Sequence, residues 1–171
     1  MENYPKGGDI NDVQSQLFLA YVESQNWDKA LSLWLELTPE NRKKEDYLSG
    51  YLKVNKALGT EATLKVATDL LKLNPNSIDA LETLAIHYYQ VSEDRYQKEM
   101  LDYERNRTSK QYRQLLNALE EINASFRISR DYLERLYTLN PNPRFATLLG
   151  NIYTRFDNKQ RADFYYRKAK N

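Results

Sequence analysis

Leu149-Gly150-Asn151-Ile152-Tyr153, followed nine residues later by Ala162-Asp163-Phe164-Tyr165-Tyr166-Arg167-Lys168-Ala169, decides the fold of this 171-residue chain. Both segments place apolar or small residues three or four positions apart, which is the spacing of one helix face. Gly150, Ala162 and Ala169 are small, and small residues let the backbones of two crossing helices approach closely. A helical pair of this kind cannot bury its apolar face alone, so the sequence predicts further pairs along the chain.

The same pattern recurs along the whole chain at a nearly constant interval. Leu149-Gly150 occupies a position in the repeat that holds two apolar or small residues. Earlier in the chain this slot is occupied by Leu17-Phe18, Gly50-Tyr51, Leu84-Ala85 and Leu115-Leu116, and the steps between successive pairs are 33, 34, 31 and 34 residues. Prolines, which stop helices, stand where pairs should end, at Pro39, Pro75 and Pro141. This period predicts an all-α chain of about five stacked helix-turn-helix repeats.

These motifs resemble the tetratricopeptide repeat (TPR), whose pattern is W-x2-L-G-x2-Y…A-x3-F…P. The resemblance covers residues 11–171 and is most specific in residues 143–171. It implies a right-handed α-solenoid, a superhelix whose first helices line a concave groove. Because members of the family are mostly scaffolds and co-chaperones, it also implies a non-catalytic adaptor that binds a peptide or helix of a partner protein in that groove.

The repeat boundaries follow from the period, with one stretch that fits poorly. We expect residues 1–10 to form a flexible lead-in, and repeats at about 11–43, 44–77, 78–108, 109–142 and 143–171. Residues 92–107 lack the small residues of a second helix, although Tyr96, Met100 and Tyr103 form a helical stripe. Thr108 and Gln111 have the spacing of a capping box that starts a new helix. Alternatively, residues 92–123 are a helical hairpin inserted into one of four repeats.

The register of the first helices predicts which side chains face the groove. These partner-binding candidates are Leu19, Val22, Leu52, Ile86, Tyr89, Arg113, Asn117, Arg144, Asn151 and Arg155. The apolar members could instead belong to the core between repeats. The arginines could bind a carboxylate or phosphate, because their planar guanidinium makes paired hydrogen bonds. They could instead pair with Glu120, Glu121 and Asp157 on a solvated face.

The best-known TPR ligand is the acidic C-terminus of heat-shock chaperones, which a carboxylate clamp holds. Arg113 and Asn117 could imitate the first Lys–Asn pair of that clamp, but Leu148 stands where the next asparagine should be. Ser15 and Leu19 do not match the clamp in the first repeat. We therefore predict no chaperone-type carboxylate clamp.

Composition excludes several other classes of function. The chain has no cysteine and a single histidine, His87, so we expect no metal site, no cofactor and no catalytic residues. No apolar run approaches the roughly 20 residues of a membrane span. The net charge is +1, which disfavours nucleic-acid binding, although residues 91–171 are more basic than residues 1–90.

The sequence is also compatible with two other functions and with two cellular locations. The chain ends after the last predicted repeat without a polar capping helix, so that repeat could stack on a second copy or continue into a larger TPR protein. A basic helical-repeat nucleic-acid binder is the weakest alternative. Since no signal peptide is visible, a cytoplasmic location is favoured, and a mature exported form remains an alternative.

Overall fold

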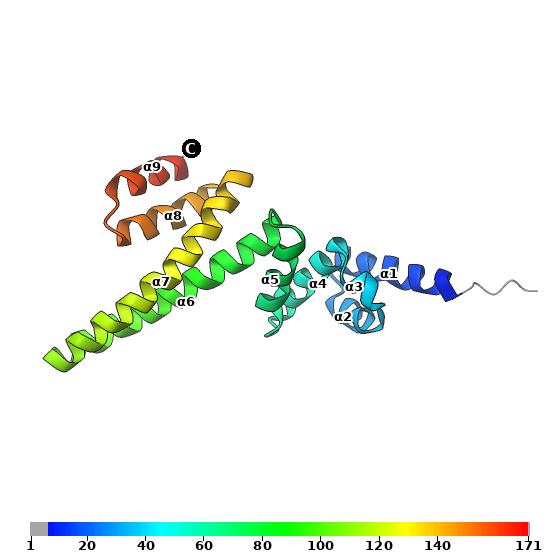
Figure 1. Ribbon diagram of the computed structural model, residues 1–171, viewed down its shortest axis with the longest axis horizontal. Helices are drawn as coiled ribbons and strands as arrows, with labels where there is room; N and C mark the ends of the chain where they lie inside the picture. The colour runs from blue at the N-terminus through cyan, green and yellow to red at the C-terminus, as the bar shows by residue number, and fades with distance from the viewer. Residues whose placement is uncertain (1–6, 171) are drawn as a thin grey trace, which may run out of the picture. The chain divides into compact units, whose positions relative to one another are not determined.

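The computed structural model describes residues 7–170, and the chain divides into two units between Ala80 and Leu81. All regular secondary structure in the described range is α-helical (Figure 1). None of the helices within residues 7–170 is long and apolar enough to cross a membrane. The two units are described separately below.

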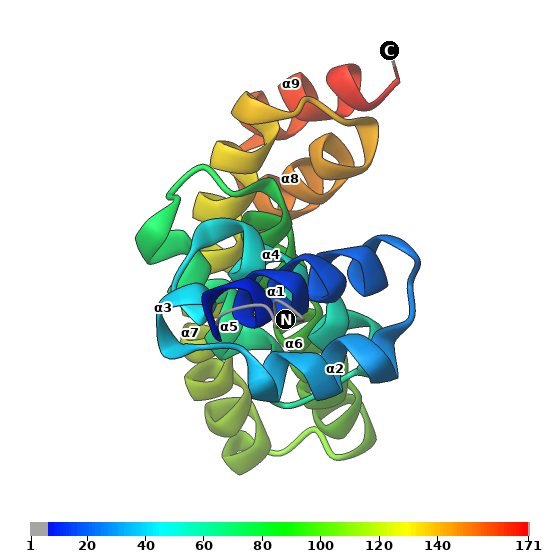
Figure 2. The same ribbon diagram turned by 90° about the vertical axis from the view of Figure 1, so that its right-hand side faces the viewer.

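The first unit contains two helical pairs and one short helix (Figure 2). The first pair is α1 (Gly7–Glu23) with α2 (Trp27–Glu36), and the second is α4 (Glu45–Leu58) with α5 (Thr63–Leu73). Between them lies α3 (Pro39–Arg42), which starts with proline after the capping side chain of Thr38. Gly59 ends α4 in the left-handed conformation, a common way to stop a helix.

Aromatic packing joins α1, α2 and α4 into one core. Phe18 is fully buried, with its ring centroid 5.6 Å from that of Trp34. Trp34 stacks on Tyr51 of α4 with 3.9 Å between centroids. Gly50 of α4 leaves room for the Phe18 ring of α1, because a Cβ at residue 50 would lie 3.0 Å from Cε1 of Phe18. The small and aromatic residues of the repeated slot therefore form the helix contacts that their spacing predicted.

The predicted lead-in over residues 1–10 is wrong for its last four residues. Residues 1–6 lie outside the described range, and α1 begins at Gly7. Two glycines weaken a helix by about 1 kcal/mol each relative to alanine but do not remove a backbone donor, so a helix can run through them.

The second unit begins with two long antiparallel helices (Figure 1). These are α6 (Ile78–Arg105), whose first three residues precede the division, and α7 (Ser109–Leu139). Ser129 donates a hydrogen bond to the carbonyl of Ala85 at 2.8 Å near one end of the pair. At the other end, the rings of Tyr103 and Tyr112 lie 5.8 Å apart. Thr108 caps α7 by accepting from the amide of Gln111, which confirms the predicted helix start.

The predicted division of this region into two repeats, 78–108 and 109–142, differs from the structure. Each of these segments contains a single unbroken helix, and together they form one long pair. The alternative interpretation is an inserted hairpin over residues 92–123, a range through which both long helices run on either side of their turn. The physical reason is that residues 76–140 contain neither glycine nor proline, so nothing interrupts either helix except the turn at residues 106–108.

The last pair is α8 (Pro143–Arg155) with α9 (Lys159–Ala169). Asn142 and Asn158 cap α8 and α9 by accepting hydrogen bonds from backbone amides. Gly150 is buried against the ring of Tyr166, and a Cβ at residue 150 would lie 2.5 Å from Cε1 of that ring. The signature residues therefore meet at the crossing of the two helices.

A tyrosine cluster joins α7, α8 and α9. Tyr153 donates to Glu134 at 2.5 Å, and Arg161 donates to the same carboxylate at 2.6 Å. Tyr165 stacks on Tyr153 with 5.7 Å between ring centroids. Burial, together with the charge of Glu134, raises the pKa of Tyr165 to about 12. Burial also raises the pKa of Tyr153.

We expect the free energy of unfolding to fall as pH rises from about 10 to 12. In the unfolded chain Tyr165 would lose its proton near its ordinary pKa of 10.0, whereas the folded chain holds that proton until about pH 12. The stabilisation that follows from the raised pKa of Tyr165 is therefore complete below about pH 10 and is lost as the pH rises to about 12. Urea unfolding at several pH values should show a shallower decline in Tyr165→Phe. An equally steep decline in that variant, or a shallower one in the exposed control Tyr112→Phe, would contradict the assignment.

Candidate binding site between α6, α7 and α8

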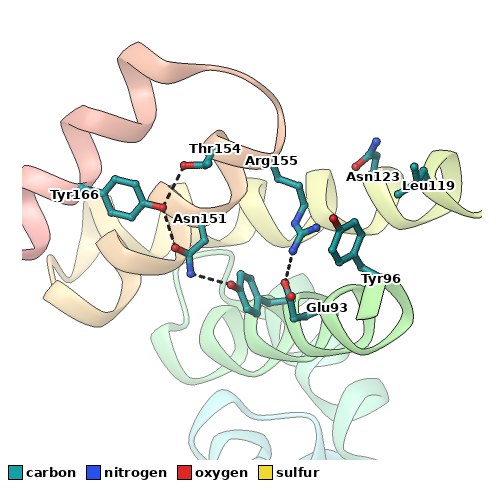
Figure 3. Close-up of a pocket in the computed structure, with 9 residues that line it drawn as sticks. Glu93, Tyr96, Leu119, Asn123, Asn151, Thr154, Arg155 and Tyr166 are labelled. Atoms are coloured by element: carbon teal, nitrogen blue, oxygen red, sulfur yellow. Dashed lines mark hydrogen bonds and ion pairs between the residues drawn. The ribbon is translucent and has the colours of Figure 1, made fainter. Parts of the chain in front are cut away.

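A pocket of about 640 Å³ lies within the second unit, between α6 and α8, at the start of the α6–α7 extension, which we define as residues 92–123. Figure 3 shows the side chains that point toward it. Its lining residues are Tyr89, Glu93, Tyr96, Leu119, Asn123, Asn151, Thr154, Arg155 and Tyr166.

A chain of hydrogen bonds orders one wall of the pocket (Figure 3). Tyr166 donates to Oδ1 of Asn151 at 3.0 Å, and the amide of Asn151 donates to the hydroxyl of Tyr89 at 3.0 Å. Thr154 adds a hydroxyl 3.1 Å from that of Tyr166. Since Tyr89 accepts from Asn151, its own hydrogen is left for another acceptor, and none of the described residues provides one. Tyr89 therefore presents a donor to whatever occupies the pocket.

Arg155 lines the pocket next to this wall and is held on three sides. Its Nη2 donates to Glu93 at 2.6 Å. Its guanidinium carbon lies 3.9 Å from the ring centroid of Tyr96 and 4.7 Å from that of Phe126. Phe126 also meets Tyr89 edge to face at 5.7 Å. The positive charge is thus paired with a carboxylate and covered by aromatic rings, so this wall is rigid and close to neutral.

The structure brings together three of the residues predicted from sequence: Tyr89, Asn151 and Arg155. Arg144 is paired with Glu82 at 3.0 Å, so Arg144 and Arg155 bind carboxylates of α6 and not the acidic residues proposed from sequence. Asn117 lines a separate polar hollow on the other side of the α6–α7 extension. Arg113 is exposed on α7 and has no ion pair with another described residue.

The prediction is wrong for part of the apolar set. Val22 belongs to the core of the first unit, with 7% of its surface exposed, and Leu52 has none exposed. Leu19 is half-buried against the same core, and Ile86 is half-buried on α6. The register predicted for α1 and α4 assigned positions that face the core to the exposed groove. The reason is that an apolar stripe alone does not distinguish a core face from a groove face.

Sequence reasoning missed the residues that complete the pocket. Phe126, Tyr96 and Glu93 position Arg155, and Tyr166 positions Asn151. One signal was present: Tyr89, Glu93 and Tyr96 follow each other at steps of four and three, which continues the predicted groove face along α6. The partners on α7 lie more than 20 residues away in sequence, so no local pattern links them to α6.

No protein-family model matches the chain, and no curated protein matches it. Among solved structures, it is similar to a protein from Bacteroides ovatus solved as a candidate protein-binding protein. That similarity has a TM-score of 0.76 and 23% identity, and covers 91% of this chain and 78% of the other. The shared arrangement of helical pairs, together with Gly150 at the signature crossing, decides the fold class. The fold is TPR-like.

Two further structures are similar at a lower level. MamA from AMB-1 has a TM-score of 0.42 and 15% identity, covering 94% of this chain and 98% of that one. TTC0263, a thermophilic TPR protein in Thermus thermophilus, has a TM-score of 0.40 and 16% identity, covering 93% of this chain and 89% of that one. The TPR-like, all-α fold class expected from the sequence is confirmed.

Proposed function

We propose that this TPR-like chain is a non-catalytic protein-interaction module that binds a segment of a partner protein in the pocket between α6, α7 and α8. The observation that carries the proposal is the ordered wall of Tyr166, Asn151 and Tyr89, which leaves the Tyr89 hydroxyl as a fixed donor. A donor of this kind suits a peptide carbonyl, and the rings of Tyr89 and Tyr96 offer contact area beside it.

The charge of the pocket supports a protein segment over a free anion or nucleic acid. Arg155 is neutralised by Glu93 within the pocket, and Arg144, seven residues before Asn151 on α8, is paired with Glu82. An incoming phosphate or carboxylate would have to compete with Glu93 for Arg155 and would lie close to its negative charge. A neutral backbone carbonyl carries no such penalty. The similar structure from Bacteroides ovatus, solved as a candidate protein-binding protein, agrees with this class of ligand.

A displayed library of unconstrained 12-residue peptides, selected on the whole chain, tests the proposal. Recovered peptides should bind Tyr89→Phe about 2- to 13-fold more weakly in fluorescence polarisation, because a lost hydrogen bond is worth roughly 0.5–1.5 kcal/mol. Tyr137→Phe is the matched control: Tyr137 is half-buried on α7, and its described contact is a ring contact with Tyr165. It should change binding less than twofold. Recovery of no peptide, or equal loss in both variants, would overturn the proposal.

A further inference from the structure

The pocket continues into an apolar strip along the α6–α7 extension. We define the extension strip as Tyr96, Met100 and Tyr103 of α6 with Tyr112, Leu116 and Leu119 of α7. Tyr96 and Leu119 line the pocket, and the steps of three and four residues keep the other members on or near the same side of each helix. The rings of Tyr103 and Tyr112 meet at the far end.

The strip is only partly used in packing α6 against α7: Tyr103 and Tyr112 meet across the pair, while Tyr96, Met100 and Leu119 are half-buried. The buried residues of this region are not members of the strip: Ser92 on α6, and Leu115, Ala118 and Ile122 on α7. By contrast, Tyr112 is 48% exposed and Leu116 is 46% exposed. The other side of the extension is polar, with Arg95 and Glu121 paired at 2.6 Å beside Glu99 and Asp102. One side of the extension is thus apolar and partly open, and the other is polar.

The chemistry of the strip determines the backbone conformation of its occupant. Met100, Leu116 and Leu119 offer no strong hydrogen-bond partner to a peptide lying over them. An extended segment would leave backbone N–H and C=O groups unpaired there, which is costly. A helix pairs its backbone internally and presents an apolar stripe, and the groove between two antiparallel helices accepts a third helix. From Tyr89 to Tyr103 the α6 backbone rises about 21 Å, which matches a helix of roughly 14 residues.

The two ends of the strip differ, and this determines the direction of the occupant. At the pocket end, the Tyr89 hydroxyl and the unpaired N–H groups of Arg155 are donors, which suit the free carbonyls at a helix C-terminus. At the turn end, residues 104–113 carry four basic side chains and one acidic one, all exposed. Positive charge there suits an acidic first turn, which helices favour at their N-termini.

We infer that the partner segment is an amphipathic helix with an acidic N-terminal turn, lying along the extension strip with its C-terminal end in the pocket. This inference rests on the proposed function. It adds the class of partner, its direction, and a second contact surface that the pocket alone does not require.

Two displayed libraries, selected in parallel on the whole chain, test the inference. One is a helix-forming 18-residue scaffold with one randomised face and a randomised first turn, and the other is a proline-containing 12-residue library that cannot form a helix. We expect binders from the helical library, with Asp or Glu enriched in the first turn. Their affinity should fall at least tenfold in Leu116→Glu and about threefold to tenfold in Arg107→Glu/Lys110→Glu. Circular dichroism should show that both variants keep the helical signal, because these side chains are exposed.

Ala124→Glu is the matched control, since it adds the same carboxylate at an exposed position of α7 that lies outside the pocket and the strip. It should leave affinity unchanged. Binders from the proline library alone, weakened by Tyr89→Phe and not by Leu116→Glu, would overturn the inference and keep the proposed function. Binders insensitive to both would overturn both. A dimer of the wild-type chain by light scattering that becomes monomeric in Leu116→Glu would also overturn the inference, because a second copy would then cover the strip.

Discussion

Phe126→Ala is expected to lower the free energy of unfolding by about 3–5 kcal/mol, the usual cost of removing a buried phenylalanine ring. Phe126 has no exposed surface and lies between α6 and α8, where its ring contacts both Tyr89 and Arg155. Its loss would leave a cavity under the pocket and free both side chains to change rotamer. Urea unfolding followed by circular dichroism measures the loss of stability.

Phe126→Leu separates the packing role from the aromatic role. Leucine keeps most of the volume, so the loss of stability should stay below about 1.5 kcal/mol. It removes the ring that covers Arg155 and contacts Tyr89, so peptide affinity should fall while the fold persists. If Phe126→Ala were as stable as the wild type, the contact of α7 with the pocket would be misassigned.

Gly150→Ala is expected to destabilise the chain by about 1–3 kcal/mol, the typical cost of forcing an extra methyl group into a packed site. Alanine is otherwise the better helix former by about 1 kcal/mol, so the sign of the effect reveals which term is larger. Here the added Cβ would lie 2.5 and 2.6 Å from two carbons of the Tyr166 ring. That ring is also tied to Asn151 by a hydrogen bond, so moving it disturbs the wall of the pocket.

A double-mutant cycle isolates this contact. In a Tyr166→Ala background the ring is gone, and Gly150→Ala should then be neutral or stabilising because only the gain in helix propensity remains. Thermal unfolding of the four proteins gives the coupling. A loss of the same size in both backgrounds would show that Gly150 is required for a reason other than Tyr166.

Local patterns predicted the helices well because helix starts and stops are local events. Asn142 and Thr108 accept from backbone amides two or three residues ahead, and proline can begin or stop a helix through its own ring. The same locality explains the error over residues 78–142. The repeat period placed two boundaries there, but the backbone responds to breakers, and residues 76–140 contain no glycine or proline.

The sequence by itself determined the all-helical class, the crossing at Gly150 and the helix start at Thr108, since each depends on residues close together in the chain or on a strict period. It also predicted that Tyr89, Asn151 and Arg155 lie on the groove face of first helices. Only the tertiary structure decided that Val22 and Leu52 are buried, because an apolar stripe has the same spacing whether it faces a core or a groove. It alone placed Phe126 and Glu93 against Arg155, since such contacts join residues far apart in sequence and depend on how whole helices pack.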